Sequence, residues 1–240
     1  MFESEGLLWA GFHHGAIAYL PIYSSSAGKA GQTEAAEPRL QLWQPEEGVP
    51  AQSITGFAED KSGGRWFSTY GEGLYVWKNE RLYQFNVADD GLLGDEIYAL
   101  ASDVQGRIWA ATDAGISICA MPLPGQKQVQ NLTTADGLPD EIITALLADP
   151  QGAMWIGTHD NGICCYDLAV RGCVFVAKNW TFGPVTDLAL FGGCELWAGT
   201  EKNGLVYIEA ATGQARTLPT GHALRSAKMQ ALYKDREGLL

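Results

Sequence analysis

The fold is decided by a repeated phrase that is clearest at residues 103–116, which read DVQGRIWAATDAGI. The phrase returns as DPQGAMWIGTHDNGI at residues 149–163 and as DKSGGRWFSTYGEGL at residues 60–74. A fourth copy, GGCELWAGTEKNGL, occupies residues 192–205. A fifth, degenerate copy, ESEGLLWAGFHHG, occupies residues 3–15. The shared pattern is Asp-x-x-Gly-x-x-Trp-x-x-Thr, followed by Gly and then Ile or Leu. Such self-similarity indicates an array of structural repeats.

The repeat tryptophans are separated by 57, 43, 46 and 42 residues. They are Trp9, Trp66, Trp109, Trp155 and Trp197. The long first interval contains residues 23–38, a small, polar and pattern-free segment. This composition predicts a flexible surface insertion.

Each repeat divides into four short segments rich in Val, Ile, Tyr, Trp and Leu, which predict β-strands. In the second repeat we expect strands over 54–59, 65–69, 74–77 and 82–86. In the third repeat we expect strands over 97–102, 107–112, 116–120 and 129–133. Four strands in about 43 residues, repeated, are typical of propeller blades. The sequence therefore predicts an all-β chain, a β-propeller of four-stranded antiparallel blades that forms a single domain over 1–240.

The two ends of the sequence are related. Residues 228–240 resemble the inner strand and first turn of a repeat, whereas residues 5–9 begin with the turn and second strand. We therefore expect five blades, with a closing blade shared between the termini and a monomeric chain. The alternative is a fragment of a longer array, which would expose blade edges and form oligomers.

Most motif positions are predicted to serve folding. The Gly of the first turn permits a positive φ, the Trp fills the gap between neighbouring blades, and the Thr bonds local backbone at the strand end.

The composition excludes several classes of protein. With 46% hydrophobic and 18% charged residues the chain is not disordered, and its net charge of −12 disfavours nucleic acid. No apolar run is long enough to cross a membrane, and no signal peptide is visible. Five cysteines without a CxxC motif favour unpaired, buried thiols over a metal site. They are Cys119, Cys164, Cys165, Cys173 and Cys194.

The repeat phrase, together with the linking phrase TADGLPDEI at 134–142, resembles the two-component regulator propeller repeat of bacterial sensor proteins. Versions of the linking phrase occur at 89–97 and 47–54. The resemblance implies a sensor module outside the cytoplasm, ahead of a membrane helix and a kinase or cyclase output, with glycans as frequent ligands. The unpaired cysteines instead favour the cytoplasm for a free-standing chain.

Antiparallel blades sort their loops onto two faces. The loops between second and third strands share a face with the loops between blades, and this face is predicted to form an acidic, His-bearing mouth. The ligand-binding candidates are His13, His14, Tyr70, Glu72, Asp113, His159, Asp160, Asn161, Trp180, Glu201, Lys202, Asn203 and His222. The inter-blade loops add Glu46, Glu47, Asp89, Asp90, Asp136, Asp140 and Phe182. The opposite face is predicted to be more basic, with Lys61, Arg65, Lys78, Arg81, Arg107, Lys127, Arg171 and Arg236.

The leading functional hypothesis is a non-catalytic propeller that binds a small molecule, a glycan or a protein partner at the mouth. One alternative is a propeller lyase or hydrolase that uses the His and carboxylate side chains, and another is a scaffold that assembles through blade edges. No nucleophile elbow or phosphate loop is present, and we expect no catalytic residue, cofactor or metal. The alternative interpretation of His13 and His14 is that they belong to a solvated turn. Trp180 is interpreted either as a stacking platform for a ligand or as packing at a blade edge.

Overall fold

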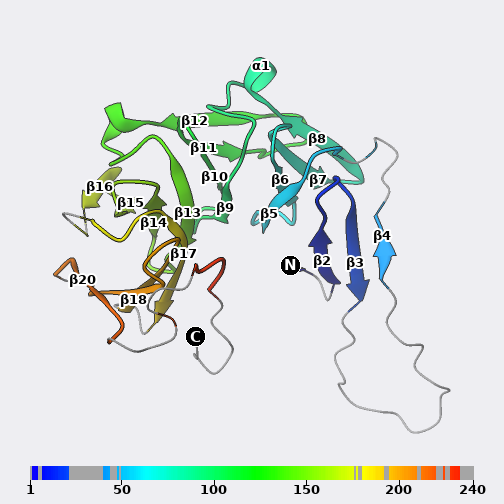
Figure 1. Cartoon of the computed structure of the whole chain (residues 1–240). Helices are drawn as coiled ribbons and strands as arrows, with labels where there is room; N and C mark the ends of the chain where they lie inside the picture. The colour runs from blue at the N-terminus through cyan, green and yellow to red at the C-terminus, as the bar shows by residue number, and fades with distance from the viewer. Residues whose placement is uncertain are drawn as a thin grey trace, which may run out of the picture.

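The computed structural model of the 240-residue chain shows five four-stranded antiparallel sheets that follow one another around an arc (Figure 1). The residues that the structure describes are 2–4, 7–21, 40–43, 48, 50–175, 177, 180–191, 195–209, 212–219, 224 and 228–232. The predicted insertion at 23–38 and four of the singled-out residues, Glu46, Glu47, His222 and Arg236, lie outside them.

Each sheet takes its strands from one stretch of chain, in the order of the sequence. The first sheet consists of β1 (Phe2–Ser4), β2 (Leu7–Gly11), β3 (Ile17–Pro21) and β4 (Gln41–Leu42). The second consists of β5 (Ile54–Glu59), β6 (Arg65–Thr69), β7 (Leu74–Lys78) and β8 (Arg81–Phe85). The third consists of β9 (Ala99–Ser102), β10 (Ile108–Thr112), β11 (Gly115–Ala120) and β12 (Gln128–Leu132). The fourth consists of β13 (Ile143–Ala148), β14 (Ala153–Thr158), β15 (Ile163–Asp167) and β16 (Gly172–Phe175). The fifth consists of β17 (Val185–Phe191), β18 (Glu195–Thr200), β19 (Leu205–Glu209) and β20 (Gln214–Thr217).

This architecture confirms the predicted all-β fold of four-stranded antiparallel blades. The strands expected in the second and third repeats agree with the observed strands to within two residues at each end. The agreement follows from the repeat itself, because its Gly and Asp residues mark the turns and its apolar residues mark the strands.

The motif residues have the structural roles predicted for them. Gly63, in the turn between β5 and β6, has a φ of 78°, which only Gly adopts without strain. Trp66 is fully buried and donates its indole N–H to Asp60 Oδ2 at 2.9 Å. Trp109 and Asp103 repeat this bond at 2.9 Å in the third sheet.

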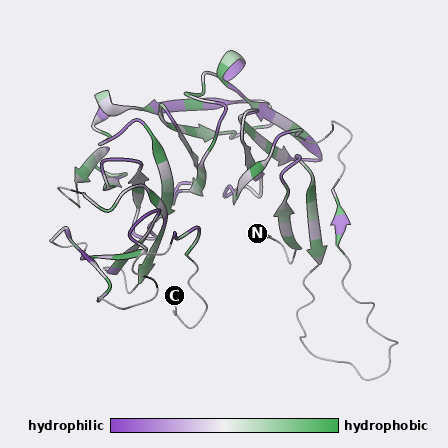
Figure 2. Ribbon diagram, viewed as in Figure 1, coloured by the Kyte–Doolittle hydropathy of each residue, from purple (hydrophilic) through white to green (hydrophobic). Residues whose placement is uncertain are grey.

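The apolar core lies in the gaps between successive sheets. The gap between the second and third sheets holds Trp66, Phe85 and Ile108, and the next gap holds Trp109 and Met154. Further clusters fill the first gap and the last gap. Figure 2 shows the corresponding hydrophobic colour along the strands. Burial between sheets explains why neighbouring strands contain apolar residues on both faces.

The predicted shared blade concerns the two ends of the arc, which the structure describes only in part. The inner place of the first sheet is taken by β1, so that all four of its strands come from residues 2–42. Residues 228–232 lie against the fifth sheet, where Met229 N donates to Thr200 O at 3.1 Å. The equivalent bond from Ile97 N to Thr69 O, at 3.0 Å, starts the inner strand of the third blade. Closure through the final residues stays a prediction, because 233–240 lie outside the described residues.

The expectation of five unpaired cysteines was wrong for two of them. Cys164 on β15 and Cys173 on β16 form a disulfide, with their Cα atoms 6.2 Å apart. Cys173 lies opposite Tyr166, two residues along β15 from Cys164, so both sulfur atoms are on one face of the hairpin. Cys119 and Cys165 are free thiols, and Cys194 lies outside the described residues.

Among the described residues, no helix has both the length and the apolar character needed to cross a membrane.

Candidate functional site

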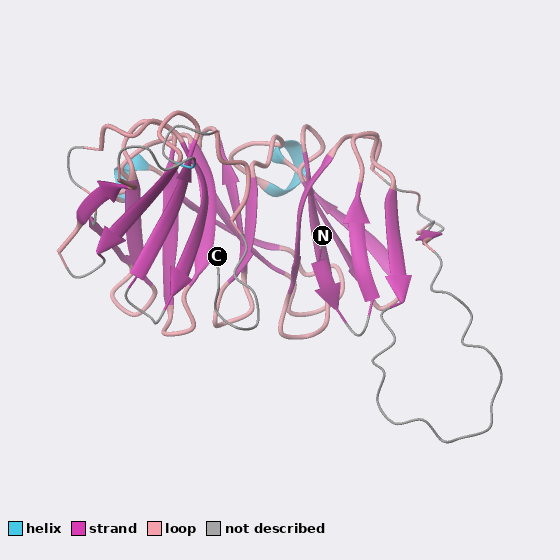
Figure 3. Ribbon diagram, turned by 60° about the horizontal axis from the view of Figure 1, so that its bottom comes forward, coloured by secondary structure: helices cyan, strands magenta, loops and turns pink. Residues whose placement is uncertain are grey.

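One end of the strands holds the turns that join the second to the third strand of each sheet. In Figure 3 both helices lie at one end of the strands, and both belong to connections between sheets. The helix α1 (Val87–Asp90) connects β8 to β9, and the 3-10 helix η1 (Thr134–Asp136) connects β12 to β13. We call this end of the molecule the mouth. It comprises the turns 12–16, 70–73, 113–114, 159–162 and 201–204 and the connections between sheets.

A threonine at the end of the second strand builds the mouth turn of each of the last four sheets. Thr69 Oγ1 donates to Gly73 O at 2.9 Å and accepts a hydrogen bond from Glu72 N at 3.0 Å. Equivalent pairs of bonds are made by Thr112, Thr158 and Thr200. The predicted local role of these threonines is confirmed, and the side chains that follow them project from rigid turns.

A group of tyrosine and carboxylate side chains lies where the second and third sheets meet. The rings of Tyr70 and Tyr98 are 6.1 Å apart and tilted by 61°, and a backbone bridge joins Tyr70 to Glu96. The Tyr98 hydroxyl lies 3.4 Å from Glu96 Oε2, and Asp113 is close enough to act electrostatically on both phenols. We call Tyr70, Glu96, Tyr98 and Asp113 the tyrosine–carboxylate cluster.

The electrostatics of this cluster keep both phenols protonated. The hydrogen bond to Glu96 and its negative charge raise the pKa of Tyr70. Burial, followed by the charge of Asp113, raises the pKa of Tyr98 to about 12. At neutral pH the cluster therefore holds two protonated phenols that are hydrogen-bonded to Glu96, with the Asp113 carboxylate nearby.

The sequence prediction included Tyr70 and Asp113 but missed Glu96 and Tyr98. Glu96 belongs to the linking phrase at 89–97, and Tyr98 follows it directly, before β9. Their place could have been inferred from the sequence, because the loop between two blades must return to the mouth beside the mouth turn of the preceding blade. The missed tyrosine stands directly after the Asp-Glu-Ile of the phrase.

The first mouth turn makes a separate network. His13 Nδ1 lies 3.2 Å from Ser53 Oγ, which donates to His13 O at 2.8 Å. Glu72 Oε2 accepts hydrogen bonds from Ala51 N at 3.1 Å and from the Tyr75 hydroxyl at 3.2 Å. The Glu72 carboxylate is therefore already hydrogen-bonded within the protein. His14 lies next to His13 on the exposed first mouth turn.

The fourth mouth turn is polar. His159 Nδ1 lies 3.0 Å from Asp160 Oδ1, and Asp160 N donates to Asp140 Oδ2 at 2.9 Å. Asn161 N donates to the Thr158 hydroxyl. This turn therefore combines an exposed imidazole with carboxylates, at some distance along the arc from the tyrosine–carboxylate cluster.

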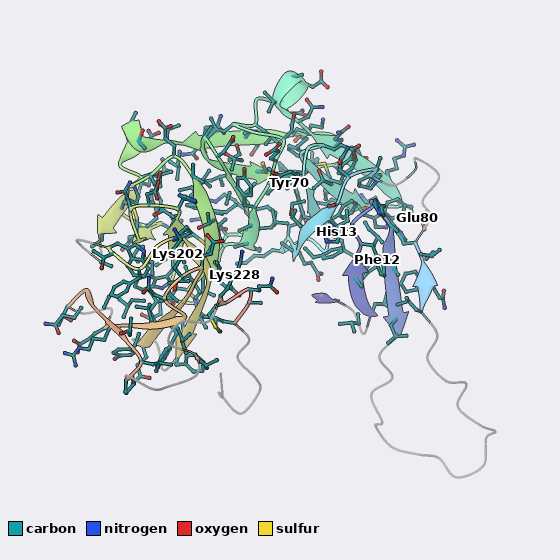
Figure 4. All side chains as sticks on the ribbon, viewed as in Figure 1. Phe12, His13, Tyr70, Glu80, Lys202 and Lys228 are labelled. Carbon is teal, nitrogen blue, oxygen red and sulfur yellow. A yellow bond between two sulfur atoms is a disulfide. The ribbon has the colours of Figure 1, made fainter. Side chains whose placement is uncertain are left out.

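The fifth mouth turn contains an ion pair. Glu201 Oε1 lies 2.9 Å from Lys228 Nζ, and this hydrogen-bonded ammonium lowers the pKa of Glu201. Lys202 extends from the same turn, and Asn203 Nδ2 donates to Phe182 O at 2.8 Å. Figure 4 shows Lys202 and Lys228 on one arm of the arc, His13 on the other, and Tyr70 between them.

Trp180 is half buried and covers the mouth side of the last gap between sheets. Its indole N–H donates to Gly183 O at 2.6 Å, and its ring lies 4.9 Å from that of Phe182. It also packs against the core cluster that contains Val185. These contacts favour the packing interpretation of Trp180 over an open stacking platform.

The predicted mouth residues form an arc and not a single pocket. Two hollows formed by the described residues, of about 340 and 300 Å³, are lined by first-turn residues at the opposite end of the strands. No three His, Cys, Asp or Glu side chains converge as metal ligands anywhere in the described part of the chain.

The predicted basic rim at that opposite end is partly neutralised. Lys78 is buried and lies 3.6 Å from Asp60 Oδ2, and Arg107 Nε lies 2.7 Å from Asp103 Oδ2. Lys127 pairs with Asp90 at 2.9 Å.

Comparison with known proteins supports the fold and the repeat. Residues 91–114 and 137–160 match the family model described as two component regulator propeller. No curated protein matches the sequence. Among solved structures, the extracellular domain of BT4673 from B. thetaiotaomicron, described as a one component system, is 20% identical with a TM-score of 0.72. The extracellular domain of BT3049 from B. thetaiotaomicron, described as a hybrid two component system, is 18% identical with a TM-score of 0.74.

Each of these two alignments covers 99% of this chain and 30% of the other, so the chain spans less than a third of their length. A streptogramin B lyase is 13% identical, with a TM-score of 0.70 and coverage of 99% of this chain and 72% of that one. At such identities the likeness shows the fold alone. The two matched segments each run from a linking phrase through Trp and Thr of the following blade, which confirms the resemblance found in the sequence. The chain is therefore a β-propeller in which two of the repeats, at residues 91–114 and 137–160, match the two component regulator propeller model.

Proposed function

We propose that this chain is the ligand-binding part of a two-component-type sensor and that its mouth binds a neutral oligosaccharide. The observation that supports this proposal best is the tyrosine–carboxylate cluster. Tyr70 leaves 47% of its surface exposed, so a ring face is accessible to a ligand. Glu96 and Asp113 stand beside it as acceptors for hydroxyl hydrogens.

The chemistry of the cluster favours sugars over other small molecules. Sugar rings present hydroxyl groups that donate to carboxylates and accept from phenols, and their C–H faces pack on aromatic rings. The net charge of −12 and the carboxylates of the mouth disfavour uronic and sulfated sugars. A neutral oligosaccharide satisfies both conditions.

We propose a location outside the cytoplasm. Disulfides persist in oxidising compartments, and the Cys164–Cys173 bond joins two strands of the fourth sheet. The two B. thetaiotaomicron structures are of extracellular domains. We further propose that the module is non-catalytic and passes a binding signal to other parts of a sensor.

Isothermal titration calorimetry with malto-, cello-, xylo- and manno-oligosaccharides tests the proposal. We expect one neutral series to bind, and Tyr70→Ala to weaken that binding by about tenfold or more, because one stacking surface and one hydroxyl are lost. Leu123→Ala is the matched control, since Leu123 is similarly exposed but lies between β11 and β12. Equal affinity in the two variants would place binding elsewhere, and exclusive binding of anionic oligosaccharides would contradict the proposal.

A further inference from the structure

A hollow of about 340 Å³ lies between the fourth and fifth sheets, at the end of the strands opposite the mouth. Its walls are mostly apolar and include Leu147, Leu188, Leu190 and Leu232. Asp149 lines it as the one charged side chain, at the start of the turn between β13 and β14. Its volume is at the lower end of the range for small-molecule sites.

Asp149 is buried, and no cation from the described part of the chain pairs with its carboxylate. Only 7% of the residue is exposed, and Oδ1 accepts one hydrogen bond, from Gln151 N at 2.8 Å. Oδ2 has no hydrogen-bond or ion-pair partner within the residues that the structure describes. An ionised carboxylate in an apolar hollow is costly unless a positive group or several donors approach it.

The equivalent carboxylates of other blades are neutralised by the protein itself. Asp60 has Lys78 at 3.6 Å, and Asp103 has Arg107 at 2.7 Å. In the fourth blade the place of Lys78 is taken by Asp167, and the place of Arg107 is taken by Ala153. The fourth blade has therefore lost both positive partners while it keeps the buried carboxylate.

The indole N–H of Trp155 is a second group without a partner, and it supports this difference between the fourth blade and the two before it. Trp155 packs in the same gap between sheets as Leu188, with its side chain buried. Its indole N–H has no acceptor, whereas the indoles of Trp66 and Trp109 donate to their Asp residues at 2.9 Å. The bond between indole and carboxylate that the second and third blades make is thus missing in the fourth blade, where the carboxylate residue Asp149 lines the hollow.

We infer that this hollow is a binding site for a small organic cation, a primary ammonium group attached to an apolar body. The ammonium group would donate to Asp149 Oδ2, and the apolar body would lie among the leucines. A charge-assisted hydrogen bond of this kind is stronger than a neutral one, and the acidic chain attracts cations to its surface. The site is at the opposite end of the strands from the proposed sugar site and does not depend on it.

One wall of the hollow comes from a distant part of the sequence. Leu232 lines it, and its backbone N–H donates to Asp187 Oδ2 on β17 at 2.7 Å. This bond holds the segment 228–232 beside the fifth sheet, so that the hollow is enclosed by three successive inner segments of chain.

The test compares benzylammonium, benzyl alcohol and benzoate as probes of similar shape on the unmodified protein. Binding is followed by ¹H–¹⁵N correlation spectra, with the Gln151 amide and the Trp155 indole N–H as local reporters. We expect saturable shifts of both signals with benzylammonium, an affinity at least about tenfold weaker for the alcohol, and no response to benzoate. Equal affinities for the ammonium and the alcohol would overturn the proposal without any variant, as would the absence of a saturable shift with every probe.

Two variants locate the site. Asp149→Asn should weaken benzylammonium binding by at least about tenfold, because the amide lacks the negative charge. Leu190→Trp should abolish binding by filling the hollow while the carboxylate remains. Asp160→Asn is the matched control, since it removes the same charge from an exposed residue at the mouth and should leave the affinity unchanged. An unchanged affinity in Asp149→Asn, or the same loss in Asp160→Asn, would refute the assignment.

Discussion

Asp60 and Asp149 occupy the same place in two repeats and are equally buried, at 8% and 7% exposure, yet their environments differ. Asp60 Oδ1 accepts hydrogen bonds from Ser62 N at 2.8 Å, Ser62 Oγ at 2.6 Å and Gly64 N at 2.9 Å. Asp60 Oδ2 accepts from Trp66 at 2.9 Å. We predict that Asp60→Asn strongly destabilises the protein and that Asp149→Asn does not.

The magnitude follows from the atoms that change. In Asp60→Asn the amide oxygen can keep the bonds of Oδ1, but an NH₂ group then faces the indole N–H of Trp66. The Lys78 ammonium, in a residue only 7% exposed, also loses its carboxylate, although it keeps its bonds to Ser62 Oγ and Met121 O. Losing one charged hydrogen bond and unpairing a buried cation should cost about 3 kcal/mol. That corresponds to a fall of about 6–12 °C in Tm for a domain of this size.

Asp149→Asn should change the free energy of unfolding by less than about 1 kcal/mol. The amide oxygen can still accept from Gln151 N, and the lost charge has no ion-pair partner in the residues that the structure describes. Equilibrium unfolding in urea, followed by circular dichroism, measures both variants against the unmodified chain. The reasoning is refuted if the two substitutions cost the same, or if Asp60→Asn costs less than about 1 kcal/mol.

The same carboxylate predicts a pH dependence. Burial would raise the pKa of Asp60, but the hydrogen bonds from Ser62, Trp66 and Gly64 together outweigh it and lower that pKa. The group therefore stabilises the folded state above its unfolded pKa of about 4, and this stabilisation is lost as the pH falls through the lower folded pKa. The difference in stability between the unmodified chain and Asp60→Asn should shrink between pH 6 and pH 3, and a constant difference would contradict this assignment.

Three further predictions concern the turns and the disulfide. Thr69→Val should cost about 1–2 kcal/mol in urea unfolding, because it removes two buried hydrogen bonds, and an unchanged midpoint would show that the turn forms without them. Gly162→Ala should cost more than Gly137→Ala, because both have positive φ but only the first new Cβ would meet side-chain atoms, at 2.7 Å. Similar melting temperatures for these two variants would argue against that clash. Reduction of the Cys164–Cys173 bond should lower stability by about 2–3 kcal/mol for its short loop, and mass spectrometry after alkylation with and without reductant would first establish the pairing.

Much of the fold follows from the sequence because one phrase encodes one blade. The Asp, Gly and Trp of the phrase place the first turn and second strand, and the Thr places the mouth turn, so the strand bounds follow with little error. The disulfide could not be predicted in this way. Adjacent Cys164 and Cys165 give no indication of which thiol faces the next strand, since that depends on the register of β15 against β16.

The candidate site was predictable only in part. The mouth turns were correctly expected to hold Tyr70 and Asp113, because antiparallel blades fix which loops share a face. Glu96 and Tyr98 were missed, since the length of an inter-blade connection does not show where it returns to the preceding turn. Trp180 was predicted as either a stacking platform or edge packing, and its contacts with Gly183, Phe182 and the core cluster favour packing.

The repeat also shows how a structural carboxylate becomes available for another use. Its position in the first turn buries the Asp in every blade where the structure describes it, and a neighbouring cation then decides whether the charge is neutralised within the blade. Lys78 and Arg107 supply that cation by different routes, one from the third strand and one from the turn itself. Where Asp167 and Ala153 replace them, the fold still forms around Asp149, and no cation among the described residues pairs with its carboxylate. In this chain the compensating charge is missing in the fourth blade, at the end of the strands opposite the mouth, so the proposed cation site and the proposed sugar site can be tested separately.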